Sequence, residues 1–317
     1  MERNIQNEPV IAVLSGGVGE EREVSLATGR AVAATLERTH RVELLEINEA
    51  TAPENLDGGS MVVFPAIHGT FGEDGELQSL LDDRGIEYAG SGVLSSRLCM
   101  DKQRTKSIVE SAGVSVPPSV VFEDWGFVDV ENVIDRFGPD LVVKPLDQGS
   151  SVSLSLIEGA DELRDAIKVL PRGNWMIEQR VFGRELTVGV LHGQSLGVVE
   201  IIPKGGVYDY DAKYLPGSSE YRYPAIIPNE MEIEVRRAAE KAFAVCGCRD
   251  FARIDFIATQ DGPWHFLEVN TIPGLTETSL LPKSASCAGY DFDRLVNELV
   301  APTIKRFQTK DFVPERN

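Results

Sequence analysis

The stretch that most constrains the fold runs from Phe251 to Leu281, where two apolar segments flank the sequence Gln260-Asp261-Gly262. An Asp-Gly turn supplies the residues with positive φ that a tight hairpin requires. The two segments are therefore predicted to pair as antiparallel strands. Polar residues interrupt each segment at alternate positions, and these are the first candidates for a site.

The predicted hairpin carries Arg253 and Asp255 on its first strand and Glu268 and Asn270 on its second. Residues two apart on a strand point to the same face. Two carboxylates and an amide oxygen form a hard, all-oxygen ligand set, which suits Mg²⁺ held between protein and substrate phosphates. A surface hairpin with solvated acids would have the same local pattern, so the choice depends on the rest of the chain.

Composition excludes several classes of protein. The 317 residues contain 31 Lys and Arg against 50 Asp and Glu, a net charge of −19, so neither nucleic acid nor an anionic membrane is an expected partner. No apolar run approaches the ~20 residues of a membrane span, and the polar first residues lack the apolar core of a signal peptide. We therefore expect a cytoplasmic protein. The length favours two or three α/β domains.

Apolar runs at Val10–Leu14, Val42–Ile47 and Met61–Ala66 alternate with helical or polar stretches. This rhythm predicts parallel strands with crossover helices, and hence an open parallel α/β domain at residues 1–95. A central unit is predicted at residues 96–183. The remaining residues, 184–317, are predicted to form an α+β unit with a lid loop and the metal site.

The expected elements of the last two units follow from the same patterns. The predicted strands are Val120–Phe122, Leu141–Lys144, Val152–Leu156, Trp175–Glu178, Leu186–Leu191 and Leu196–Ile201. The predicted helices run from near Met100 to Ser111, over Leu163–Leu170 and over Glu230–Val245. The segment Lys204–Pro224 is too polar for a core strand, and its length suggests a mobile lid.

Two acids and a histidine near the first predicted sheet are further candidates for a site. Glu21 and Glu23 follow a glycine-rich turn and put negative charge where a pyrophosphate would sit in a dinucleotide-binding loop. Glu21 fits either a substrate amine or, with Glu23, the dipole of a helix. His68 lies at the carboxyl end of a predicted strand, where open α/β sheets bind ligands, although a lone histidine there is commonly structural.

Donor groups gather at two further places. Lys144 precedes a loop with Gly149, Ser150 and Ser151, which offers N–H and hydroxyl donors to nucleotide phosphates. No Gly-Lys-Ser/Thr leads into a helix, so it is not a P-loop, and an ordinary hairpin turn is the alternative. The predicted lid contains Lys213 and Tyr214, for which contact with substrate and a solvated loop both stay open.

Seven segments, taken in order, resemble the D-alanine:D-alanine ligase family over nearly the whole chain. They are residues 21–26, 68–75, 100–102, 149–152, 208–214, 252–255 and 268–276. The resemblance implies the ATP-grasp fold, in which ATP lies between the central and C-terminal units. It also implies ligation of two D-alanine molecules through an acyl phosphate, giving D-alanyl-D-alanine for peptidoglycan synthesis together with ADP and phosphate.

The resemblance implies roles at the nucleotide. Lys102, Lys144 and Ser151 would bind ATP at its phosphates, Glu178 to Val181 would run along adenine, and Glu185 would bind ribose. Two Mg²⁺ ions, for which Mn²⁺ can substitute, would be held by Asp255, Glu268 and Asn270.

The resemblance also implies roles at the amino acids. Glu21 would bind the ammonium of the first D-alanine and join Ser150 and Tyr214 in a hydrogen-bonded trio that closes the lid, with His68 beside that substrate's carboxylate. Arg253 and the backbone near Gly274 would stabilise the oxyanion of the tetrahedral intermediate. The N–H groups of Ser279 and Leu280 would receive the second carboxylate, and Lys213 would neutralise the transferred phosphoryl group. The family further implies a homodimer.

Alternatives to D-alanyl-D-alanine synthesis are a ligase with D-serine or D-lactate as second substrate and a catalytically silent, nucleotide-binding paralogue. Tyr214 favours D-alanine over D-lactate, because relatives that use D-lactate have His in the lid. Ser153 stands where the family usually has glycine, which would stiffen the phosphate loop if that position needs positive φ. Retention of all three metal-ligand candidates argues against the silent paralogue.

Overall fold

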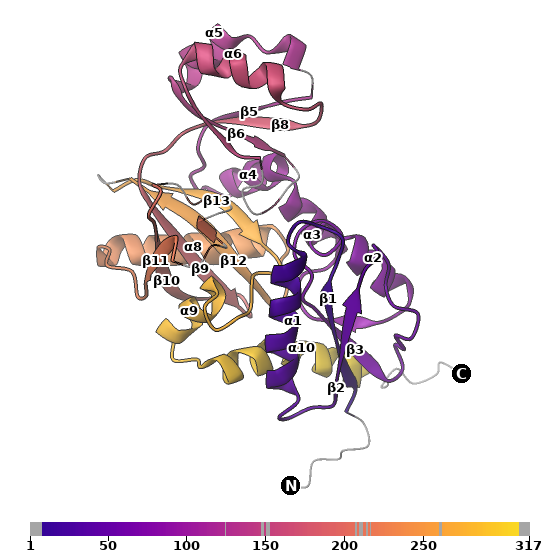
Figure 1. Cartoon of the computed structure of the whole chain (residues 1–317). Helices are drawn as coiled ribbons and strands as arrows, with labels where there is room; N and C mark the ends of the chain where they lie inside the picture. The colour runs from indigo at the N-terminus through magenta and orange to yellow at the C-terminus, as the bar shows by residue number, and fades with distance from the viewer. Residues whose placement is uncertain are drawn as a thin grey trace.

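The described part of the chain folds into three lobes, each built around one β-sheet (Figure 1). The computed structural model describes residues 8–123, 125–146, 149, 153–206, 208, 212–213, 215, 217–259 and 262–310. Ser150, Ser151 and Tyr214 lie outside the described residues, as do Gln260 and Asp261 of the predicted turn. No helix in the described part of the chain is both long and apolar enough to cross a bilayer.

The first sheet is parallel, as the sequence predicts. Its strands are β1 (Val10–Gly16), β2 (Val42–Ile47), β3 (Met61–Pro65) and β4 (Glu87–Tyr88), in the order β2-β1-β3-β4. The helices α1 (Arg22–Leu36) and α2 (Glu76–Asp83) connect them. Strand β3 is buried along its whole length, which explains its continuous apolar sequence.

The last helix, α10 (Phe292–Lys310), returns to this first sheet rather than staying with the C-terminal strands. Its residues Leu295 and Leu299 share a buried cluster with Ile11 of β1 and Phe64 of β3. Figure 1 shows it, in yellow, running behind α1 in the N-terminal lobe. The apolar face of α10 therefore completes a core begun almost 300 residues earlier in the chain.

The second sheet is antiparallel. Its strands are β5 (Ser119–Phe122), β6 (Asp140–Pro145), β7 (Ser155–Glu158) and β8 (Trp175–Gln179), in the order β5-β8-β6-β7. The helices α5 (Val130–Phe137) and α6 (Ala160–Val169) pack on it around Leu141, Leu163 and Ile177. A short 3-10 helix, η2 (Trp125–Phe127), precedes α5. The helices α3 (Val93–Met100) and α4 (Lys102–Ser111) lead into this lobe from the first.

One strand of this sheet begins later in the chain than predicted. The apolar sequence predicts a strand over Val152–Leu156, whereas β7 begins at Ser155. Ser153 has a φ of 57°, which is left-handed and incompatible with an extended strand. The turn conformation at Ser153 therefore delays the start of the strand.

The third sheet confirms the predicted hairpin. Its strands are β9 (Arg184–Leu191), β10 (Gln194–Pro203), β11 (Ser219–Arg222), β12 (Phe251–Ala258) and β13 (Trp264–Asn270). They lie in the order β11-β10-β9-β12-β13, with β12 and β13 antiparallel. The helices α8 (Asn229–Val245) and α9 (Leu280–Cys287) pack against it.

The segment Lys204–Pro224 is not wholly irregular, contrary to the sequence prediction. Its residues Ser219–Arg222 form β11 and pair with the end of β10. The alternation of exposed and half-buried positions in β11 is that of an edge strand. A four-residue strand with only one neighbour carries too little apolar sequence to be recognised in advance.

Candidate active site

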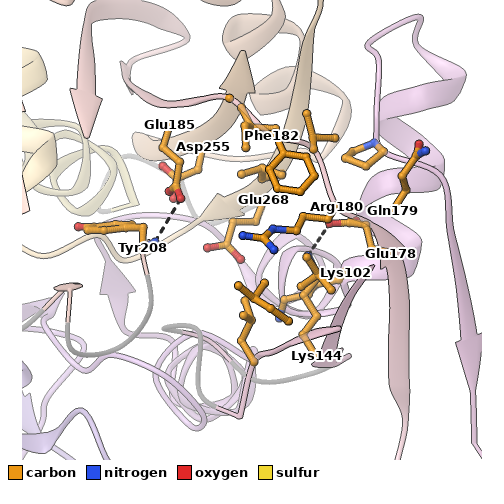
Figure 2. A pocket seen from close by; sticks show the side chains of 18 of the residues that line it. Lys102, Lys144, Glu178, Gln179, Arg180, Phe182, Glu185, Tyr208, Asp255 and Glu268 are labelled. Atoms are coloured by element: carbon orange, nitrogen blue, oxygen red, sulfur yellow. Dashed lines mark hydrogen bonds and ion pairs between the residues drawn. The ribbon is translucent and has the colours of Figure 1, made fainter. Parts of the chain in front are cut away.

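A cavity of about 250 Å³ lies between the second and third sheets. Lys144 of β6 and Glu178 of β8 face Asp255 of β12 and Glu268 of β13 across it (Figure 2). Lys102, Val181 and Glu185 also line this cavity. The structure thus brings together five described residues that the sequence predicts for ATP and two that it predicts for the metal ions.

A second cavity, of about 730 Å³, opens beside the first. Its lining includes residues predicted for the amino-acid substrates, namely Glu21, His68, Arg253, Gly274, Ser279 and Leu280. Tyr208 and Lys213 line both cavities. Lys213 therefore lies at the boundary between the two cavities.

Asp255 is hydrogen-bonded by the side chains of Arg253 and Asn270. Nε and Nη2 of Arg253 donate to its two carboxylate oxygens at 2.9 and 2.8 Å, and Nδ2 of Asn270 donates to Oδ2 at 3.0 Å. Burial acts to raise the pKa of Asp255, but the Arg253 guanidinium outweighs it and holds the pKa below its usual value. Asp255 is therefore an anion at neutral pH.

Glu268 and Glu185 face the same region, but their pKa values shift in opposite directions. Burial acts to raise the pKa of Glu268, and the nearby Lys213 and Lys102 outweigh it, so the pKa is lowered. Burial raises the pKa of Glu185 to about 7, with Asp255 adding to the effect and Lys213 opposing it. Repulsion among these carboxylates is the reason that a cation would be stabilised here.

The donor set fits Mg²⁺ but does not enclose it. Asp255 and Glu268 offer carboxylate oxygens, and Asn270 has an amide oxygen beside the nitrogen it uses on Asp255. Within the described ranges, no three His, Cys, Asp or Glu side chains form a metal site by themselves. An open set of this kind matches a metal ion that also takes phosphate oxygens and water as ligands.

His68 is held rigidly in the second cavity. Its Nδ1 is 2.8 Å from the carbonyl oxygen of Ile272, and its Nε2 is 3.0 Å from Oγ1 of Thr28. Burial acts to lower the pKa of His68, but the carboxylates of Glu73 and Glu21 outweigh it and the pKa is raised. The ring therefore links the segment after β3 to α1 and to the loop before α9.

Glu21 lies against two glycines. A Cβ at Gly69 would come within 2.9 Å of Oε2 of Glu21, and one at Gly149 would lie 3.6 Å from the same atom. Side chains at these positions would crowd the carboxylate. Gly149 is next to Ser150 in the chain, which is the residue that the sequence predicts as a partner of Glu21.

The N-terminus of α9 forms one wall of the second cavity. The Ser279 N–H donates to the Thr276 carbonyl at 2.9 Å, and its hydroxyl accepts from the Thr276 N–H at 3.0 Å. The predicted binding of a substrate carboxylate by the Ser279 and Leu280 N–H groups stays a prediction. The buried side chain of Lys283 also lines this cavity, with its ammonium 4.7 Å from the ring centre of Tyr221.

The sequence patterns did not single out Lys106 or Lys283. Lys106 is one helical turn after Lys102, and Lys283 is four residues after Ser279. Residues four apart share a helix face, so each lysine continues the face of a residue that was predicted. The helix predicted from near Met100 to Ser111 already contained this signal for Lys106, whereas no helix was predicted over the segment with Lys283.

Comparisons with known proteins agree with this geometry. Residues 108–301 match the family model described as "D-ala D-ala ligase C-terminus", and residues 45–91 match "D-ala D-ala ligase N-terminus". The D-alanine–D-alanine ligase of Syntrophotalea carbinolica is 42% identical over 308 residues, covering 95% of this chain and 98% of that protein. The corresponding protein of Aquifex aeolicus is 44% identical over 294 residues, covering 92% and 99%.

Solved structures are similar over the same extent. The D-alanine–D-alanine ligase of Bacillus anthracis complexed with ATP superimposes with a TM-score of 0.82 at 29% identity, covering 96% of this chain and all of that one. The VanG D-Ala:D-Ser ligase of Enterococcus faecalis gives a TM-score of 0.80 at 29% identity, covering 93% and 99%. These similarities confirm the predicted ATP-grasp fold, and the chain belongs to the D-alanine–D-alanine ligase family.

Proposed function

We propose that this protein uses ATP to join two D-alanine molecules into D-alanyl-D-alanine, releasing ADP and phosphate, for peptidoglycan synthesis. The observation that carries this proposal is the pair of adjoining cavities with Lys213 on both walls. One cavity has the cations and acids suited to a nucleotide and its metal ions. The other has an acid, a histidine and an arginine suited to amino acids.

ATP occupies the first cavity in this proposal. Lys102 and Lys144 offset the charge of its phosphates, the segment from Glu178 to Val181 runs along adenine, and Glu185 binds ribose. Ser151 is assigned to the phosphates on its position in the sequence. Two Mg²⁺ ions, replaceable by Mn²⁺, are assigned to Asp255, Glu268 and Asn270; when bound, they offset the negative charge that accumulates on the phosphates during transfer.

The first D-alanine is activated in the second cavity. Glu21 binds its ammonium, His68 lies beside its carboxylate, and Lys213 offsets the charge of the phosphoryl group as it reaches that carboxylate. The product of this step is an acyl phosphate, which water hydrolyses readily. Ser150 and Tyr214 are assigned to the hydrogen-bonded trio with Glu21 that closes the lid and excludes water.

The second D-alanine enters beside α9. The N–H groups of Ser279 and Leu280 are assigned to its carboxylate, and its neutral amine attacks the acyl phosphate. The Arg253 guanidinium has five N–H donors, so the two bonds to Asp255 leave donors for the oxyanion that forms. The backbone near Gly274 is assigned to the same oxyanion, which collapses with loss of phosphate.

The test is phosphate release from Mg·ATP by the purified protein with D-alanine, L-alanine, D-serine, D-lactate or no amino acid, with products identified by mass. Release that depends on D-alanine and yields the dipeptide is expected, and Asp255→Asn is expected to abolish it. Nucleotide binding without turnover on any substrate would instead favour the silent paralogue. Efficient turnover with D-serine would place the chain with the D-Ala:D-Ser ligase that it resembles in fold.

Three further assignments belong to the same proposal. The protein acts in the cytoplasm, where ATP is available. It forms a homodimer, which light scattering of the purified protein would test. Its domains divide at residues 95 and 183, with α10 packing back on the first domain.

A further inference from the structure

A buried lysine behind the nucleotide cavity has no role in the function proposed above. Lys106 lies on α4 and is 3% exposed. Its ammonium forms an ion pair with Oε2 of Glu178, and neither atom makes a hydrogen bond to any other described group. A buried ammonium is costly unless it is paired. Lys106 therefore depends on Glu178 to keep its charge in this position.

Glu178 connects Lys106 to the nucleotide cavity. The Glu178 side chain on β8 is almost fully buried, and its other oxygen, Oε1, accepts from Nζ of Lys144 at 2.8 Å (Figure 2). Lys144 and Glu178 line the cavity, whereas Lys106 is not among the lining residues. The row Lys106–Glu178–Lys144 therefore begins behind the wall of the cavity and ends inside it.

The charges in this row depend on one another. Burial acts to raise the pKa of Glu178, but the two lysines outweigh it and hold the pKa below its usual value. Without Lys106, Lys144 would be the one cation paired with this buried carboxylate among the residues that the structure describes. A charge-assisted bond to both oxygens would then draw Lys144 toward Glu178 and away from a ligand in the cavity.

We propose that Lys106 is a positioning residue for ATP: by holding one oxygen of Glu178, it leaves Lys144 shared between the other oxygen and the nucleotide. The inference rests on the proposed nucleotide cavity and deepens it. Lys106 touches neither ATP nor the reacting atoms in this account. Its effect is expected on nucleotide affinity, not on the binding of amino acids.

The test is the dissociation constant of ATP with Mg²⁺ for Lys106→Met, measured by calorimetry beside steady-state kinetics. The affinity for ATP is expected to fall about ten-fold or more, the size typical of losing an outer-shell partner, with KM for D-alanine unchanged. The matched control is Lys241→Met. Lys241 also contacts the end of α4, through the Ala112 carbonyl, but it is exposed, whereas Lys106 is buried against Glu178.

A double variant separates positioning from folding. In Lys106→Met combined with Glu178→Gln, no buried carboxylate is left to capture Lys144, so ATP affinity is expected to recover part of the loss. Wild-type affinity in Lys106→Met, or a loss that the second substitution deepens, would overturn the proposal. Absence of ATP binding in the wild-type protein would count against the nucleotide cavity itself, so the two failures are distinguishable.

A pH series gives a readout that a merely structural lysine would not move. Burial lowers the pKa of Lys106 to about 8. The charged groups that act on it are Glu178 of β8, Lys144 of β6 and Glu268 of β13. The side chain of His265 on β13 is also nearby, and burial and Lys106 lower its pKa. ATP affinity in the wild type is expected to weaken as pH rises through about 8, and Lys106→Arg is expected to move that loss to higher pH. Identical profiles for the two proteins would contradict the proposal.

Discussion

Ser153 holds a side chain in a left-handed backbone conformation, with φ of 57°. It follows the predicted phosphate loop, at the position where the resemblance to the family led us to expect glycine. A residue with a Cβ pays a conformational penalty there that glycine does not. Position 153 therefore does adopt a positive φ. This was the condition under which the sequence predicted a stiffer phosphate loop, so a stiffer loop is expected.

Ser153→Gly is expected to be more stable than Ser153→Ala by ~1 kcal/mol in free energy of unfolding. Alanine keeps the Cβ and therefore the strain, which makes it the matched control for loss of the hydroxyl. Chemical denaturation of the three proteins measures the difference. A more stable alanine variant would show that the left-handed conformation is not maintained in solution.

Even a conservative substitution of Arg253 is expected to impair the reaction. Arg253→Lys keeps the positive charge beside Asp255 but loses the paired bonds to its two oxygens and the donors left for an oxyanion. We expect kcat to fall about 10²-fold or more, the effect of removing an oxyanion donor, with ATP affinity changed less. Measuring kcat and ATP binding together decides this; equal losses in both would make Arg253 a nucleotide-site residue.

At the scale of elements, the segment between β8 and β9 ties the second sheet to the third and forms one wall of the nucleotide cavity. Gly183 lies in it, beside the exposed ring of Phe182, which stacks on the Arg180 guanidinium. A Cβ at Gly183 would come within 2.2 Å of the Ala258 carbonyl oxygen on β12. Only glycine allows this close approach of two backbones.

Gly183→Ala is therefore expected to displace this segment and to raise KM for ATP, while KM for D-alanine stays within two-fold. Gly205→Ala is the control, because a Cβ at Gly205 meets nothing within 4 Å and its φ is ordinary. Steady-state kinetics with each substrate varied in turn measures both. If the two variants behave alike, the contact with Ala258 has no influence on the nucleotide cavity.

For the whole molecule, contacts of α10 connect the C-terminal end of the chain to the N-terminal lobe. Arg306 of α10 donates to both oxygens of the buried Asp250 at 2.8 and 2.9 Å, and to the Tyr88 carbonyl at 2.8 Å. Arg38 of the N-terminal lobe also pairs with α10, through Asp293, but both of those side chains are exposed. The Arg306 pair joins α10 to the residue before β12, and the Arg38 pair joins α10 to the N-terminal lobe. The first pair is the more buried of the two.

Arg306→Ala is expected to cost about 3 kcal/mol of unfolding free energy, because it leaves a buried carboxylate short of its partner. Arg38→Ala is expected to cost less than about 1 kcal/mol, as solvated pairs do. Thermal and denaturant unfolding measure both, and KM values are expected to stay near wild type in each. Equal losses of unfolding free energy would mean that burial does not determine how much each ion pair stabilises the fold.

Local sequence predicted much of the fold because periodicity and turn chemistry act over short distances. The β12–β13 hairpin and the parallel first sheet are confirmed. Strand β11 was missed because an exposed edge strand has little apolar sequence. The start of β7 was placed too early because the φ of Ser153 is not visible in its identity.

By itself, the sequence determined the alternation of strands and helices, the acidic and amide side chains on the last hairpin, and the motifs that resemble the family. Each of these depends on neighbours in the chain. Only the tertiary structure decided that Lys213 borders two cavities, that α10 completes the first core, and that Lys106 faces Glu178. These relations join residues far apart in sequence, and they arise from burial of apolar faces and pairing of buried charge, which no local pattern specifies.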